Sequence, residues 1–333
     1  ILLTMCIANR FLSGASEAAA SGADQALAFD TLVEHKEEER WDEVLATTMR
    51  WRSMGFFVAM IIGALVYDPR VLNGLLGTEL DHSTTLRLPV AIVFVQSLVC
   101  LSLALRMREP KPPTEQPPCP LGERCGSAFR LTLRTALWVV QTPAAFCIVL
   151  GTLLVDSVVR NFVTINSEYY LLVGMPEWSF GFLGAATAAL GFFVPALAQR
   201  ANRRFGPMQN LALISGGVFL CLLCVIPAWP YFGVLPVILL FTAFGWIEFL
   251  SSSTLNKLAD SSQRATVLSV KGLAWNLGYG LLGLTYAGIL GVFEKQEGSA
   301  GAALLRGLPW QAAWFAVTMA LFFLFCGRRH RSA

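Results

Sequence analysis

The stretch NRFLSGASEAAASGADQALAFD, residues 9–30, decides the fold of this chain. Most of its residues are small and favour a helix, and it continues directly from the apolar ILLTMCIA. It nevertheless carries four charged side chains, Arg10, Glu17, Asp24 and Asp30. Charges on a helix of this kind predict a face that avoids lipid and lines a wet cavity or contacts other helices.

The composition is that of an integral membrane protein. The chain has 333 residues, of which 55% are hydrophobic and 14% are charged, and its mean hydropathy is +0.58. A soluble domain carries about 25% charged residues, so this chain is too apolar to keep its surface in water. The formal net charge of +3 is small and gives no reason to expect a nucleic-acid partner.

Several segments have the length and apolarity of membrane-spanning helices, because a span needs about 20 mostly apolar residues. The nine expected spans are 1–32, 53–66, 88–105, 142–172, 179–197, 211–228, 232–252, 267–292 and 310–325. We therefore expect an all-α protein embedded in the lipid bilayer.

The loops give the orientation of these helices. Most of the 25 Lys and Arg residues fall in alternate loops, and this excess marks the cytoplasmic side. It places residues 34–52, residues 106–141 and the C-terminus in the cytoplasm. Residues 106–141 are rich in Pro and charge and are the expected linker between a three-helix region, 1–105, and a six-helix bundle, 142–333.

An internal repeat accounts for the odd number of spans. GASEAAASGADQALAFD, residues 14–30, and GWIEFLSSSTLNKLAD, residues 245–260, both begin with G-x-x-E and end on Asp. Three expected helices precede the second copy within its half, whereas none precedes the first. Six-helix repeats are a known transporter plan, so we expect a twelve-helix protein of which the three N-terminal helices are missing.

Several motifs resemble those of the major facilitator superfamily, aligned with that family's helices 4 to 12. RFLSGASEA is similar to the helix-4 motif R-x-x-Q-G-x-x-x-A, with Arg10, Gly14 and Ala18 matching and Ser13 in place of Gln. LAQRANRRFGPMQNL resembles the basic loop between helices 8 and 9, and RATVLSVKGLAWNLGYGLLG resembles the start of helix 11.

The resemblance implies a secondary active transporter of the bacterial inner membrane. Such a protein moves a small solute by alternating access between two six-helix halves, and we expect coupling to protons and a monomeric protein. The resemblance also implies a cytoplasmic gate. The gate candidates are Asp24, Asp30, Arg200, Arg203 and Arg204.

The charged residues of the first helix are candidates for the cavity. Arg10, Glu17 and Asp24 are spaced by seven residues and share one helix face. Arg10 and Glu17 are roughly 10 Å apart along the axis, so each needs a partner elsewhere. We predict that both residues serve coupling or line the cavity; the alternative is structural pairing between helices.

Two later spans hold further candidates. Asp156 and Arg160 have the i,i+4 spacing of an ion pair, and Asn161 lies beside them. The resemblance implies solute contact there; the alternative is a self-neutralising pair that faces a neighbouring helix. Glu248 is the repeat partner of Glu17 and has no basic residue within one turn. Desolvation favours the protonated form of such a carboxyl, so we predict a proton carrier; the alternative is a neutral, hydrogen-bonded Glu.

Enzymatic chemistry is not indicated. The CxxC of Cys221 and Cys224 lacks a second pair of ligands, and GYGLLG, residues 278–283, lies inside an apolar span. We expect no cofactor and no metal. Two alternatives to a working transporter remain open, namely a non-transporting membrane scaffold or sensor, and an inactive truncated fragment.

Overall fold

The computed structural model describes residues 2–20, 23–67, 69–77, 81–85, 87–107, 121–260 and 263–331. Within these ranges every regular element is a helix. The helices from the N-terminus to residue 141 are α1 (Leu2–Ala20), α2 (Ala23–Glu34), η1 (Glu38–Arg40), α3 (Trp41–Tyr67), α4 (Pro69–Leu76), α5 (His82–Thr85), α6 (Leu88–Ala104) and α7 (Leu121–Gln141). The later helices are α8 (Pro143–Leu172), η2 (Glu177–Ser179), α9 (Phe180–Arg204), α10 (Pro207–Val225), α11 (Val234–Leu258), α12 (Arg264–Glu297) and α13 (Ala300–Arg331).

Six helices in the described ranges, α8 to α13, are long and apolar enough to cross a membrane. They coincide with the six spans expected after the Pro-rich stretch. The described part of the expected span 1–32 forms helices α1 and α2, and the expected spans 53–66 and 88–105 correspond to α3 and α6. Helix α6 has only 17 residues, and α1 and α3 are long enough but not apolar enough to count as spans. The structure therefore shows an all-helical, multi-pass protein, with six rather than nine spans supported by length and composition.

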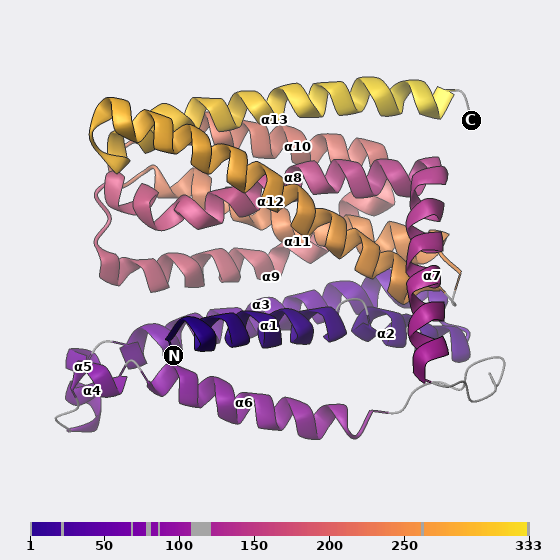
Figure 1. Ribbon diagram of the computed structural model, residues 1–333, viewed down its shortest axis with the longest axis horizontal. Helices are drawn as coiled ribbons and strands as arrows, with labels where there is room; N and C mark the ends of the chain where they lie inside the picture. The colour runs from indigo at the N-terminus through magenta and orange to yellow at the C-terminus, as the bar shows by residue number, and fades with distance from the viewer. Residues whose placement is uncertain are drawn as a thin grey trace.

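Helix α8 is the centre of the C-terminal helices. It packs against α10, α11, α12 and α13, while α9 packs against α11 (Figure 1). Val155, Val158, Val159 and Phe162 of α8 are fully buried. Neighbouring helices thus cover most of the circumference of α8, including its polar residues Asp156 and Asn161.

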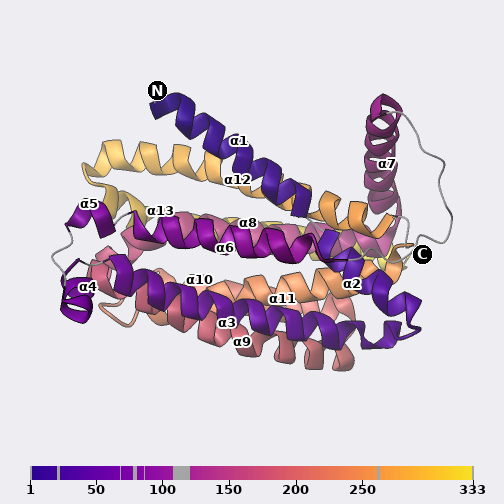
Figure 2. The same ribbon diagram turned by 90° about the horizontal axis from the view of Figure 1, so that it is seen from below.

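The N-terminal segment, which we define as α1 to α6, reaches these six helices mainly through α3. Helix α3 runs alongside α9 (Figures 1 and 2). Two glycines of α9 permit this approach, because a Cβ on Gly191 would lie 3.1 Å from Ser53 Oγ and one on Gly184 would lie 3.3 Å from Met60 Sδ.

A second contact between the two parts lies where α2 and α3 meet α9 and α11. Phe29 and Trp41 pack edge to face with ring centroids 5.2 Å apart, and they share a buried cluster with Ala198 and Phe249. This cluster positions the polar residues of α2 against α11 and α12.

The expected linker contains a helix that the sequence analysis did not predict. Helix α7 covers residues 121–141, stands across the end of the bundle and packs against α8 and α12 (Figure 1). The Pro-rich residues 108–120 lie outside the described ranges. Helix α6 stands apart from the six later helices and has no buried residue.

Candidate functional site

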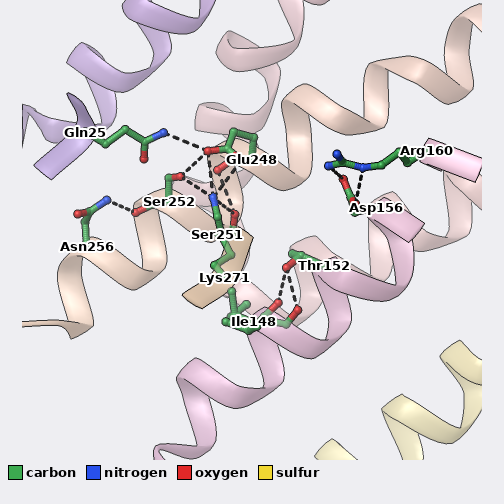
Figure 3. A network of polar contacts seen from close by, with 11 residues as sticks. Gln25, Ile148, Thr152, Asp156, Arg160, Glu248, Ser251, Ser252, Asn256 and Lys271 are labelled. Carbon is green, nitrogen blue, oxygen red and sulfur yellow. Dashed lines mark hydrogen bonds and ion pairs between the residues drawn. The ribbon is translucent and has the colours of Figure 1, made fainter. Parts of the chain in front are cut away.

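An ion pair between a buried lysine and a partly buried glutamate joins α11 to α12. Lys271 Nζ lies 3.0 Å from both Oε1 and Oε2 of Glu248, and Lys271 is only 5% exposed (Figure 3). Two serines of α11 complete the shell: Ser252 Oγ donates to Glu248 Oε1 at 2.9 Å, and Lys271 Nζ lies 3.3 Å from Ser252 Oγ and 3.5 Å from Ser251 Oγ. These hydroxyls partly replace the water that both charges lose on burial.

The pair is also tied to the N-terminal segment. Gln25 of α2 donates its Nε2 to Glu248 Oε1 at 3.0 Å (Figure 3). The other amide atom, Gln25 Oε1, is buried without a hydrogen-bond partner among the described residues. On the opposite side the Lys271 ammonium lies 4.7 Å from the ring centroid of Trp275, a cation–π contact. One carboxylate thus connects three helices, and we call Gln25, Glu248, Ser251, Ser252 and Lys271 the Glu248 network.

The local sequence explains why these groups face one another. Glu248, Ser252 and Asn256 are spaced by four residues, so they form one polar stripe along α11. Asn256 Nδ2 donates to the Ser252 carbonyl oxygen at 2.8 Å, which continues the stripe toward the end of the helix. Lys271 and Trp275 share the same spacing on α12.

The interpretation of Glu248 as a carboxyl without a basic partner was wrong. Its partner is 23 residues away in sequence, on the next helix. A search within one helical turn cannot find such a residue. The structure buries Lys271 itself in α12.

The pair expected from the spacing of Asp156 and Arg160 forms within α8. Arg160 Nη2 lies 2.8 Å from Asp156 Oδ1 and Nε lies 3.0 Å from Oδ2, a two-pronged contact (Figure 3). Asp156 is fully buried, whereas the Arg160 side chain is 34% exposed and also reaches Asn276 Oδ1 at 3.4 Å.

Asn161 lies next to this pair in sequence and is buried. Its Nδ2 has no hydrogen-bond partner among the described residues. A donor of this kind can bind a solute or a water molecule, since buried polar atoms are normally paired.

Two ion pairs connect the N-terminal segment to the same end of α11 and α12. Arg264 Nη1 lies 2.9 Å from Asp30 Oδ1 of α2, and its guanidinium lies 4.0 Å from the ring centroid of Phe29. Arg264 Nε also donates to the Asn256 carbonyl oxygen at 3.2 Å. Arg264 therefore binds to α2 and to the end of the polar stripe at once.

The second ion pair starts from Asp42 at the beginning of α3. Its Oδ2 lies 2.8 Å from Lys257 Nζ, and its Oδ1 accepts a hydrogen bond from Ser253 Oγ at 2.6 Å. Asn202 of α9 donates to the same Ser253 oxygen at 3.1 Å. Asp42 thus holds the start of α3 against α11.

The structure describes the other predicted residues to different extents. Arg10 and Glu17 belong to α1, but their side chains lie outside what the structure describes. Asp24 is exposed and accepts a hydrogen bond from the Gln25 backbone N–H at 2.8 Å. Exposed basic residues end α9, and within the described ranges none of them forms an ion pair; they are Arg200, Arg203 and Arg204.

Sequence reasoning missed five residues that make the contacts between helices. They are Gln25, Asp42, Lys257, Arg264 and Lys271. One signal was present: Lys271 falls inside the expected span 267–292, where a charge requires a partner.

Comparison with known proteins agrees with this architecture at the level of the family. No individual curated protein and no solved structure matches the chain. A sequence profile of the Major Facilitator Superfamily matches residues 2–283, which include α1 to α11 and the part of α12 that carries Lys271. The chain therefore belongs to the major facilitator superfamily.

Proposed function

We propose that the chain is a secondary active transporter that moves a small solute by alternating access and is coupled to protons. Membership of a family of membrane transporters supports the general class. The observation that carries the finer proposal is the Glu248 network. Its partly buried carboxylate contacts both Lys271 of the six later helices and Gln25 of the N-terminal segment.

Alternating access requires contacts that separate in one state and form in the other. The polar contacts that the structure describes between the N-terminal segment and α11–α12 are made by three side chains, Gln25, Asp30 and Asp42. A partly exposed ion pair contributes about 0.2–1 kcal/mol, whereas two conformations of a protein typically differ by a few kcal/mol. Contacts of this strength hold a gate closed at one end of the molecule and still allow it to open.

The position of Glu248 supports the proposal of proton coupling. Protonation neutralises the Glu248 carboxylate and removes its attraction for Lys271. Loss of the hydrogen bond from Gln25 leaves a position on the carboxylate free to accept a proton. A proton therefore competes with Lys271 for Glu248, and the outcome depends on where α2 lies. We assign Glu248 and Lys271 to coupling, and Asp30 with Arg264 to the gate.

The second pair is the better candidate for solute contact. The Arg160 guanidinium is about one-third exposed although Asp156 beneath it is buried, and Tyr279 and Asn276 lie beside it. A fixed cation flanked by an amide and an aromatic ring can bind a polar solute. Arg10, Glu17 and Asn161 remain cavity candidates, and Asp24, Arg200, Arg203 and Arg204 remain gate candidates.

The remaining proposals concern the setting of the transporter. We propose a bacterial inner membrane protein with two helical halves joined by the linker, and with its C-terminus in the cytoplasm. The charge bias of the loops supports this orientation. The start of α3, helix α7 and the end of α13 gather at one end of the molecule (Figure 1).

The test is uptake by proteoliposomes under an imposed proton gradient, with a panel of radiolabelled sugars, amino acids, carboxylates and organic cations. Wild-type protein should accumulate at least one solute above protein-free liposomes, and a protonophore should abolish the accumulation. Glu248→Gln should lose accumulation but retain exchange of that solute, whereas the control Glu294→Gln, an exposed carboxyl of α12, should retain both. Accumulation by Glu248→Gln at the wild-type level would place proton coupling elsewhere.

A further inference from the structure

Two cysteines that no transport step uses meet inside the bundle. Cys147 lies near the start of α8 and Cys326 near the end of α13, and their Sγ atoms are 2.6 Å apart. Both residues are buried, at 7% and 1% exposure. The sulfur atoms are in direct contact but remain beyond the S–S bond length of about 2.05 Å.

The packing on both sides holds this contact in place. One residue before Cys147, the ring of Phe146 packs edge to face on Phe325 with centroids 6.3 Å apart. One turn after it, Gly151 lets Phe322 approach so closely that an added Cβ would lie 2.7 Å from Phe322 Cζ. The two helices are thus fixed side by side at the cysteines, which makes the sulfur contact a lasting feature of the fold.

We propose that Cys147 and Cys326 are an oxidative modification site that forms a reversible disulfide between α8 and α13. The oxidant is a small neutral peroxide, because the buried contact excludes larger reagents. Peroxide first oxidises one thiol to a sulfenic acid and releases one water. The second thiol then attacks that sulfur, the S–O bond breaks, and a second water leaves as the S–S bond forms. Two electrons pass from the thiols to one peroxide molecule.

The disulfide acts as a staple of the six later helices. It links residues 179 positions apart, and cross-links that close long loops restrict the unfolded chain most strongly. Both helices belong to the same group, so the bond crosses none of the contacts made by Gln25, Asp30 or Asp42. Oxidation should therefore raise the thermal unfolding temperature by about 5–10 °C. This inference does not depend on the proposed transport function.

The experiment treats the full chain in lipid nanodiscs with hydrogen peroxide, removes the peroxide, unfolds the protein in denaturant, and then alkylates, digests and analyses it by mass spectrometry. Most of the protein should yield a peptide pair linked through Cys147 and Cys326, and dithiothreitol added to the unfolded protein before alkylation should break the link. Cys221 and Cys224 of α10 serve as the internal control and should be recovered as alkylated thiols. Cys147→Ser and Cys326→Ala should each abolish the linked peptide and the rise in unfolding temperature.

Three outcomes would overturn the proposal, and none depends on whether a variant folds. In the first, Cys147 and Cys326 of the peroxide-treated wild-type protein are both recovered as alkylated thiols. In the second, they are oxidised singly to sulfinic acids without a link. In the third, the linked peptide forms but the unfolding temperature does not change, which would refute the staple.

Discussion

Two charge pairs within the described helices, each with one fully or nearly fully buried member, differ in how they are built. Asp156 and Arg160 are four residues apart on one helix, and their two-pronged contact is complete as soon as α8 forms. Glu248 and Lys271 are 23 residues apart on two helices, and a third helix adds Gln25. The first pair is therefore insensitive to the position of α2, whereas the second changes when α2 moves. That difference is why we assign coupling to the second pair and solute contact to the first.

The largest expected effect comes from breaking the second pair on one side. Lys271→Met leaves Glu248 buried without its counter-charge and should destabilise the protein by about 3–5 kcal/mol. Denaturation in mixed micelles measures the loss. The double variant Glu248→Gln with Lys271→Met removes both charges and should recover most of it. If Lys271→Met were as stable as the wild type, the charge pair would contribute nothing to the free energy of unfolding, and the prediction would be wrong.

The first pair should respond asymmetrically. Arg160→Gln strands the fully buried Asp156 and should cost about 2–3 kcal/mol, because a buried charged group loses its partner. Asp156→Asn should cost less, since the partly exposed Arg160 can turn toward water. The same denaturation assay ranks the two variants. Equal losses would contradict the unequal burial of the two side chains.

The spacing between the two pairs depends on one glycine. A Cβ on Gly278 of α12 would lie 2.7 Å from Leu153 Cδ2 and 2.9 Å from Ser157 Oγ of α8. Gly278→Ala should therefore push α12 away from α8 and cost about 1–2 kcal/mol. The matched control is Gly280→Ala, two residues along the same helix, where nothing lies within 4 Å. The control should be neutral or stabilising because Ala favours the helix. Equal losses at both positions would contradict the close approach.

The smallest effects should come from the partly exposed ion pair between Asp42 of α3 and Lys257 of α11. Lys257→Ala removes a half-exposed partner of Asp42 and should cost about 0.2–1 kcal/mol, with less effect at high salt. Asp42→Ala should cost about 1 kcal/mol more, because it also removes the acceptor of Ser253. A salt titration of stability for both variants checks this. An effect of Lys257→Ala that grows with salt would contradict the ion pair.

The sequence was sufficient for what depends on local patterns. Apolar length predicted the six helices α8 to α13, and the i,i+4 spacing predicted the Asp156–Arg160 pair. The motif around Arg10 pointed to the family that the profile match establishes.

The contacts between helices could not be predicted from the sequence, for a physical reason. Pairing of Glu248 with Lys271, of Asp30 with Arg264 and of Asp42 with Lys257 depends on which helices become neighbours. Periodicity within one segment carries no information about that. Helix α7 was missed because Pro and charge dominated the interpretation of the linker, although the residues after 120 carry a strongly amphipathic helical pattern.

The most direct measurement of the Glu248 network is the distance between α2 and the end of α11. Spin labels at the exposed residues Thr31 and Leu258, in a background without other reactive cysteines, report this distance by pulsed electron paramagnetic resonance in nanodiscs. We predict two distance populations in the wild type, and a shift toward the longer one in Glu248→Gln, which weakens the bonds to Gln25 and Lys271. The control Glu294→Gln should leave both populations unchanged. A single distance that is the same in all three proteins would contradict a network that opens and closes.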